Sequence, residues 1–256
     1  MLPLLIYYNQ SGRLSEAPQG GFLDHRGNGK PRLMCGTYRF LHKKTNAFPK
    51  LTKKQFLCRR ASRPRGTKSS SKQIGQYCHV QVQHALLCVP MNKCECKAKG
   101  LVRKQSPSWA MVQAAKRFIQ DQQLVPLCGE LIIANPAWGL ATRFDLLCER
   151  NPAHRVLVSW KTTGQCPFDP RMKKVGLSAL VCQMPLATAS SELLACREHT
   201  AQIALEAHIL QTKHDVPLQQ AFIVYLSPGQ DSYRCIEVAE LDTATAVAEW
   251  IAAHRL

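Results

Sequence analysis

Two residues in the C-terminal half, Asp145 and Lys161, have the types and positions that phosphodiester chemistry needs. Asp145 stands at the end of one apolar run, and Lys161 ends another. A carboxylate can hold Mg²⁺ or Mn²⁺ against a phosphate group. An ammonium group can lower the pKa of an attacking water or neutralise the charge of the transition state. An ordinary pair of solvated strand ends would also contain such residues, so their positions must be considered together with the elements that carry them.

Both residues belong to predicted strands that a tight turn joins. Residues 140–149 and 155–161 are both mostly apolar, and Asn151-Pro152 between them is a turn signal. If these strands form a hairpin, Asp145 and Lys161 reach the same end of a sheet. The spacing therefore favours one shared site.

Further elements must surround these strands. Helical spacing of apolar residues predicts a helix over residues 73–89, and Ser106-Pro107 opens a second helix that ends before Pro126. The other predicted elements are a strand over 127–134, a turn over 135–139, a helix over 190–212, a strand over 220–226 and a helix over 242–253. This order predicts an α/β fold with a mixed central β-sheet flanked by helices.

The two strands that carry Asp145 and Lys161 resemble a known motif. In the PD-(D/E)XK nuclease superfamily, a strand with an Asp precedes a strand that ends in acid-x-Lys-Thr, and Arg143-Phe-Asp-Leu-Leu followed by Ser159-Trp-Lys-Thr is similar. The RecB-type and lambda-exonuclease-like members resemble the chain most, over residues 72–256. This resemblance implies a restriction-endonuclease-like core and a nuclease, dependent on Mg²⁺ or Mn²⁺, that hydrolyses phosphodiester bonds as a DNA exonuclease.

The resemblance also implies roles for residues outside the hairpin. His79, which ends Gly75-Gln-Tyr-Cys-His, corresponds to a His of the family's upstream helix that can join the metal shell. Glu130 matches a frequently acidic position, and Gln202 stands where the family often has a Gln that binds DNA or orients the site. The implied metal ligands are therefore His79, Glu130 and Asp145, and the implied catalytic residues are Asp145, Lys161 and Gln202.

The chain departs from the family at Ser159, where the second acidic residue of the motif is expected. A hydroxyl group is a much weaker ligand for a hard divalent cation than a carboxylate. Three alternatives follow. His79, Asp145, a backbone carbonyl near Trp160 and Glu130 can still hold one metal; Glu149 can replace the missing acid; or the fold is a catalytically inactive nucleic-acid-binding protein.

The positive charge of the chain is concentrated in its N-terminal half. Residues 1–120 contain 23 Lys and Arg against three acidic residues, whereas residues 121–256 contain 11 against 14. Such an asymmetry indicates binding to a polyanion, which can be nucleic acid, an RNA-rich particle or acidic lipid. The resemblance to nucleases implies nucleic acid, and DNA rather than RNA. We expect residues 1–71 to form a basic, partly disordered N-terminal extension, and residues 72–256 to form the nuclease-like domain. A solvated basic tail and a structural packaging protein are the alternatives.

The remaining composition indicates a globular protein. It has 45% apolar residues and no run long enough to span a membrane, and its N-terminus lacks the features of a signal peptide. Twelve scattered Cys are typical of reduced thiols rather than a disulfide scaffold. We therefore expect an intracellular protein, nuclear or cytoplasmic, without a membrane partner. A compact nuclease with a basic extension would suit a virus or mobile element, and the sequence does not predict the oligomeric state.

Overall fold

The main body of the chain is built on one mixed six-stranded sheet. The computed structural model describes residues 14–16, 22–24, 32–34, 70–87, 107–162, 166–167, 171–177 and 191–253. The strands of the sheet are β4 (Val125–Gly129), β7 (Leu146–Asn151), β8 (His154–Lys161), β9 (Lys174–Gly176), β10 (Gln220–Leu226) and β11 (Tyr233–Ala239). Their order in the sheet is β4-β7-β8-β10-β11-β9.

The connections explain why the sheet is mixed. β4 pairs with β7, and β7 with β8, in antiparallel fashion, and the turn after Asn151 joins the second pair as a hairpin. β8 and β10 are parallel because α8 (Ser191–Lys213) crosses over between them. β11 is antiparallel to β10 and parallel to β9. The predicted α/β fold with a mixed central sheet flanked by helices is confirmed.

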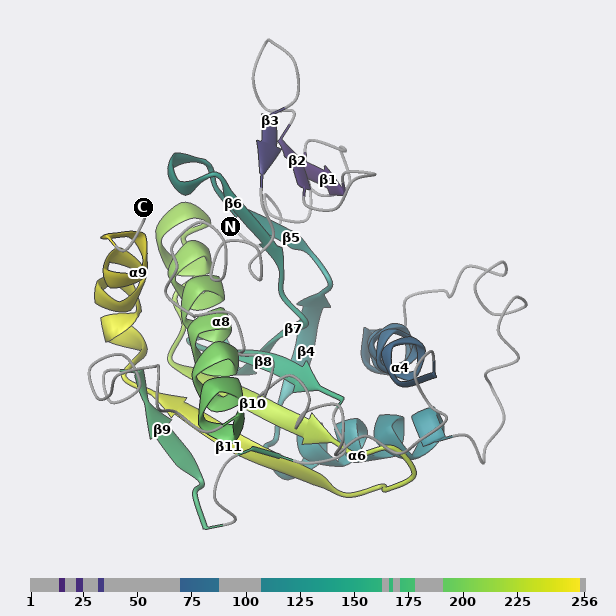
Figure 1. Ribbon diagram of the computed structural model, residues 1–256. Coiled ribbons are helices and arrows are strands. Elements are labelled where there is room, and N and C mark those ends of the chain that lie inside the picture. The colour runs from purple at the N-terminus through teal and green to yellow at the C-terminus, as the bar shows by residue number, and fades with distance from the viewer. Residues whose placement is uncertain are drawn as a thin grey trace.

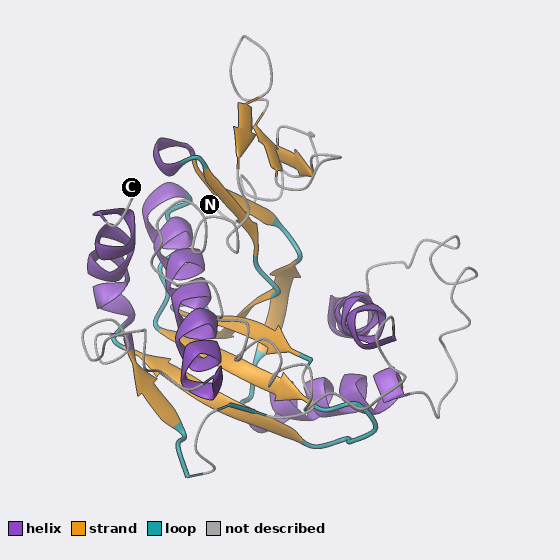
Figure 2. Ribbon diagram, viewed as in Figure 1, coloured by secondary structure: helices purple, strands orange, loops and turns teal. Residues whose placement is uncertain are grey.

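Helices cover both faces of the sheet (Figures 1 and 2). α4 (Ser70–Leu87) and α6 (Pro107–Asp121) lie on one side, and α8 and α9 (Ala244–Ala253) lie on the other. Within the described residues, no helix combines the length and apolar character that crossing a membrane requires.

The alternation of side chains along the strands divides the core in two. Successive strand residues point to opposite faces. In β8, Val156, Val158 and Trp160 pack in the cluster of α4 and α6, whereas Leu157 packs in the cluster of α8 and α9. Ser159 and Lys161 follow Leu157 at intervals of two, so the chain directs both toward the face that α8 covers.

Two predicted strands are each broken in the structure. Residues 127–134 divide into β4 and β5 (Ile132–Asn135), and residues 140–149 divide into β6 (Leu140–Arg143) and β7. β5 and β6 form a separate two-stranded sheet, with the short helix η2 (Pro136–Trp138) at the turn between them. The interruptions fall at Glu130 and Asp145, whereas the sequence predicts continuous strands through both residues.

The sequence missed further strands. β9 and β11 were not predicted. Residues 9–33 are rich in Gly, Pro and polar residues and predict a loop, but β1 (Leu14–Glu16), β2 (Phe22–Asp24) and the start of β3 (Arg32–Met34) fall in this range and form one small antiparallel sheet. The rest of the predicted extension, residues 1–71, lies outside the described residues except for the first two residues of α4. A flexible basic extension therefore stays a prediction.

Candidate metal centre

The breaks in the two strands bring Glu130 and Asp145 together. Glu130 has a positive φ of 54°, which turns the chain out of the sheet after β4. Its backbone N–H donates to the carbonyl oxygens of Phe144 and Asp145 at 3.0 and 3.3 Å. A Cβ on Gly129 would lie 2.5 Å from the Asp145 carbonyl oxygen, so only glycine permits this close approach. The segment that follows β4 and the segment that precedes β7 thus leave the sheet at the same level.

One line of residues on α4 faces these strand ends. Gly75, His79 and Gln83 are spaced four residues apart and share one side of the helix. A Cβ on Gly75 would lie 2.6 Å from Thr162 Oγ1, which shows how closely the helix approaches the end of β8. Gln83 Nε2 donates to the Gly129 carbonyl oxygen at 3.2 Å. These two contacts fix the helix position that aims His79 at the site.

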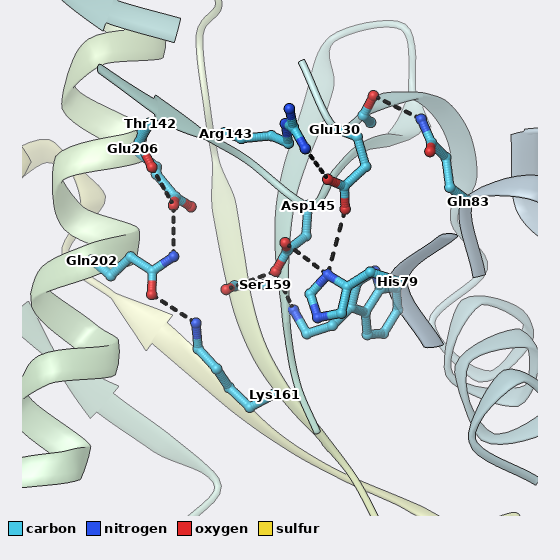
Figure 3. Close-up of polar contacts among 12 residues, drawn as sticks. His79, Gln83, Glu130, Thr142, Arg143, Asp145, Ser159, Lys161, Gln202 and Glu206 are labelled. Atoms are coloured by element: carbon cyan, nitrogen blue, oxygen red, sulfur yellow. Dashed lines mark hydrogen bonds and ion pairs between the residues drawn. The ribbon is translucent and has the colours of Figure 1, made fainter. Parts of the chain in front are cut away.

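His79, Glu130 and Asp145 form a group that can hold a metal ion (Figure 3). His79 Nδ1 lies 3.2 Å from Asp145 Oδ1 and 3.4 Å from Glu130 Oε1. One ligand atom from each residue lies within 4.8 Å of the others. The three side chains are partly buried, with exposed fractions of 26%, 19% and 12% for His79, Glu130 and Asp145. The structure therefore brings together the three residues that the sequence proposed as ligands.

The charges in this group reinforce one another. Burial alone would lower the pKa of His79, but Asp145 and then Glu130 outweigh it and raise that pKa to about 10. Burial would raise the pKa of Asp145, but His79, Lys161 and the Trp160 N–H together lower it. Metal ligation requires the neutral imidazole. A bound cation must therefore displace the His79 proton, which the two carboxylates stabilise. Two carboxylates with one imidazole are a donor set that suits a divalent cation.

The second oxygen of Asp145 is held by β8. The backbone N–H of Trp160 donates to Asp145 Oδ2 at 2.7 Å, and Ser159 Oγ donates to the same oxygen at 3.2 Å. Ser159 is fully buried. Its hydroxyl group therefore orients the carboxylate and is itself already engaged, so in this arrangement Ser159 supports a ligand rather than being one.

Lys161 faces the same carboxylate from the next strand. Its ammonium group is close enough to contribute to the lowered pKa of Asp145. Lys161 Nζ donates to Gln202 Oε1 at 2.8 Å, which connects β8 to α8. The structure thus brings Lys161 and Gln202 into contact beside Asp145, as Figure 3 shows.

Glu149 does not join the group. It lies four residues beyond Asp145 on β7, pairs with Arg155 across the hairpin and forms an ion pair with that residue. The alternative in which Glu149 replaces the missing acid is therefore wrong. A strand rises by more than 3 Å per residue, so four positions carry its carboxylate well away from Asp145.

Two polar contacts near Lys161 were not predicted. Glu206 is buried in α8, accepts a hydrogen bond from Gln202 Nε2 at 2.9 Å and contacts Thr142. A single acid in the apolar stretch 203–210 was the signal that could have revealed it. Tyr225, to which the sequence assigned no role, lies beside Lys161 in the sheet and contacts His199 Nδ1 through its hydroxyl group at 2.8 Å.

Comparison with known proteins adds little to these residues. No protein-family model matches the chain, and no curated protein matches it. The solved crystal structure of SSO0001 is similar at 10% sequence identity and a TM-score of 0.26, over 72% of this chain and 87% of that chain. A likeness of this size carries no argument about fold or function.

Proposed function

We propose that this chain is a divalent-metal-dependent nuclease with a PD-(D/E)XK-type, restriction-endonuclease-like core, which hydrolyses phosphodiester bonds and acts as a DNA exonuclease. The observation that carries the proposal is the meeting of His79, Glu130 and Asp145 beside Lys161. Mg²⁺ or Mn²⁺ fits the oxygen-rich donor set best. A cation bound there supplies the positive charge that the transition state of phosphodiester hydrolysis requires.

Each residue of the site has a separate role in the proposed reaction. Asp145 presents Oδ1 to the metal side while Trp160 and Ser159 hold Oδ2, so the ligand keeps one orientation. Lys161 offers an ammonium group from the adjacent strand, where it can stabilise negative charge on a phosphate or on an attacking water. His79 and Glu130 complete the metal set from α4 and from the end of β4.

The proposal is tested by incubating the purified full chain with end-labelled linear DNA and with closed circular DNA, in Mg²⁺, in Mn²⁺ or in EDTA. We expect the linear substrate to be degraded in either metal and not in EDTA, and Asp145→Asn to abolish degradation. Glu149→Gln is a matched control, because its carboxylate lies outside the site. Degradation that persists in EDTA, or in Asp145→Asn, would contradict the proposal.

A catalytically inactive nucleic-acid-binding protein on the same fold is the second candidate. The observation that favours it is Ser159, which stands where the family has an acid and whose hydroxyl group is engaged by Asp145. In that case the wild-type chain binds DNA in the same assay without cleaving it in any divalent metal. Cleavage by the wild type excludes this candidate.

A further inference from the structure

A buried acid on α8 stands behind the site. Glu206 has only 1% of its surface exposed, within the fully buried stretch 203–210. Burial, and then the charge of Asp145, raise its pKa to about 8, although Lys161 and two hydrogen bonds act in the opposite direction. Burying a carboxyl group costs free energy, and an apolar side chain would pack here without that cost.

The contacts of Glu206 form a chain that ends at Lys161. Glu206 Oε1 accepts a hydrogen bond from Gln202 Nε2 at 2.9 Å, and Gln202 Oε1 accepts one from Lys161 Nζ at 2.8 Å. The two α8 residues are four apart, the spacing that places side chains side by side on a helix. Thr142 Oγ1 holds Glu206 Oε1 from β6 at 3.4 Å. Figure 3 shows the complete chain.

The hydrogen bonds from Glu206 to Lys161 determine which end of the Gln202 amide faces Lys161. An amide group has a donor end and an acceptor end, and Lys161 can only donate. With an acceptor at Glu206, the NH₂ end of Gln202 turns to that residue and its oxygen turns to the ammonium group. Without such an acceptor, nothing holds the NH₂ end of Gln202 on the side of residue 206, so the amide is free to turn its oxygen away from Lys161 and leave the ammonium group without this partner.

We propose that Glu206 is a positioning residue for Lys161 and acts through Gln202. The inference rests on the proposed nuclease function, in which Lys161 is the cation beside the scissile phosphate. Glu206 is not a further ligand, because it lies outside the group of three that meet within 4.8 Å, and Gln202 and Thr142 engage it. Its effect is on the aim of the Lys161 side chain.

The test compares Glu206→Met with Glu206→Gln in the full chain. Met keeps the length of the side chain without an acceptor, whereas Gln keeps the acceptor oxygen. We expect Glu206→Met to lower kcat for DNA cleavage in saturating Mn²⁺ by about tenfold, a loss of transition-state stabilisation alone. The KM for DNA and the rise of Tm with added Mn²⁺ should stay unchanged. Glu206→Gln should restore most of kcat. Gln211→Met, on the same helix but bonded to the Leu218 carbonyl oxygen, is the control.

Two further measurements separate positioning from a general loss of structure. In a Lys161→Met background, Glu206→Met should cause no additional loss of activity, because residues that act through one another are not additive. By NMR, the side-chain NH₂ group of Gln202 should be protected from exchange with solvent in wild type and in Glu206→Gln, because the hydrogen bond to residue 206 holds one of its protons. That protection should be lost in Glu206→Met.

The outcomes distinguish this inference from the function on which it rests. A wild type that cleaves, together with Glu206→Met that has wild-type kcat, overturns the positioning role and leaves the nuclease intact. The same role is overturned if Glu206→Gln fails to restore kcat, or if the losses from Glu206→Met and Lys161→Met add. A wild type that cleaves no DNA in any divalent metal overturns the proposed function, and this inference with it.

Discussion

At the residue scale, the site divides its charged groups between ligation and catalysis. Asp145 contacts His79 on one oxygen and the Trp160 N–H and Ser159 on the other, so it links the metal group to β8. Lys161 belongs to a separate hydrogen-bonded chain that leads into α8. Removing one group or the other should therefore have separable effects on metal binding and on rate.

Lys161→Met should leave metal binding intact and lower the rate of DNA cleavage. The change deletes the ammonium group that faces Asp145 but none of the three ligand side chains. We expect the rise of Tm with added Mg²⁺ to persist while kcat falls by about 10²- to 10³-fold, the cost of one preorganised electrostatic group. Asp145→Asn should instead lose both. The measurements are thermal melts with and without Mg²⁺ and single-turnover cleavage, and equal losses of metal binding in the two variants would contradict the division.

Ser159→Asp should lower the stability of the metal-free protein and raise its affinity for the metal. The buried hydroxyl group of Ser159 now donates to Asp145, and a carboxylate at this position would face that residue without a proton to share. Two adjacent carboxylates repel each other unless a cation lies between them. We expect a lower Tm in EDTA, a larger rise of Tm with Mg²⁺ than in wild type, and faster cleavage if the missing acid limits the rate. Ser159→Asn, which adds similar bulk without charge, is the control.

At the element scale, the site depends on the closeness of α4 to the strand ends. Gly75 lets the helix approach Thr162, and Gly129 lets β4 approach Asp145. These glycines are the physical reason that His79 and Glu130 reach the same carboxylate. They also explain why the sequence predicts continuous strands over 127–134 and 140–149. The left-handed backbone of Glu130 and the close approach of distant segments leave no periodic pattern in the sequence, so neither break could be predicted.

Gly75→Ala should separate helix stability from metal affinity. Alanine favours the helix by up to about 1 kcal/mol over glycine, but its Cβ would lie 2.6 Å from Thr162 Oγ1. The helix must then shift, or Thr162 must rotate, and His79 one turn further along loses its aim. We expect Mn²⁺ affinity to fall by about tenfold, at the low end of the effects of residues that support metal ligands. Isothermal titration with Mn²⁺ measures it.

The collision can be relieved by a second change. Because the nearest atom to the new Cβ is Thr162 Oγ1, Gly75→Ala combined with Thr162→Ala should recover most of the lost Mn²⁺ affinity. Thr162→Ala alone serves as the control and should bind Mn²⁺ as wild type does. A double variant no better than Gly75→Ala would show that the close approach does not position His79.

The burial of Glu206 in α8 predicts a pH-dependent stability. Burial raises its pKa from 4.5 to about 8, so the folded chain keeps this proton where the unfolded chain has lost it. The contribution of Glu206 to stability is therefore complete below pH 4.5 and is lost as the pH rises through about 8. Glu206→Gln has no such proton, so the Tm of wild type minus that of Glu206→Gln should decrease steadily over this range. A difference independent of pH would contradict the raised pKa.

At the scale of the whole molecule, the order of elements was predictable and the outer strands were not. The two flanking helices, the hairpin of β7 and β8, the crossover helix and β10 all follow from apolar periodicity and from Pro and Asn turn signals. β11 carries Arg234 and Glu237 among its apolar residues, and β9 has only three residues, so neither shows a clear alternation. The burial of Glu206 was not predicted from the sequence because charged residues usually lie on the surface.

The charge of the N-terminal half predicts how the whole chain meets DNA. Paired basic residues, among them Lys43-Lys44 and Arg59-Arg60, lie outside the described residues, in the part of the sequence that has almost no acid. Binding of Lys and Arg to phosphates releases counterions, so each phosphate bound steepens the dependence of affinity on salt. If these pairs bind the backbone of DNA, their removal should weaken binding without changing the chemistry of the metal site.

Replacing Lys43, Lys44, Arg59 and Arg60 with Gln should therefore raise the Kd for DNA and flatten its salt dependence. We expect the slope of log K against log salt to decrease in magnitude by about 0.9 for each phosphate of duplex DNA that the variant no longer binds, while kcat at saturating DNA is retained. Fluorescence anisotropy across a salt series, followed by cleavage assays, measures both. Arg150→Gln is the control: this exposed residue lies at the end of β7 remote from Asp145 and should leave the slope unchanged. Unchanged affinity and slope in the fourfold variant would assign the basic pairs to another purpose, such as nuclear import or a protein partner, because a phosphate-binding surface cannot lose four charges without releasing fewer counterions.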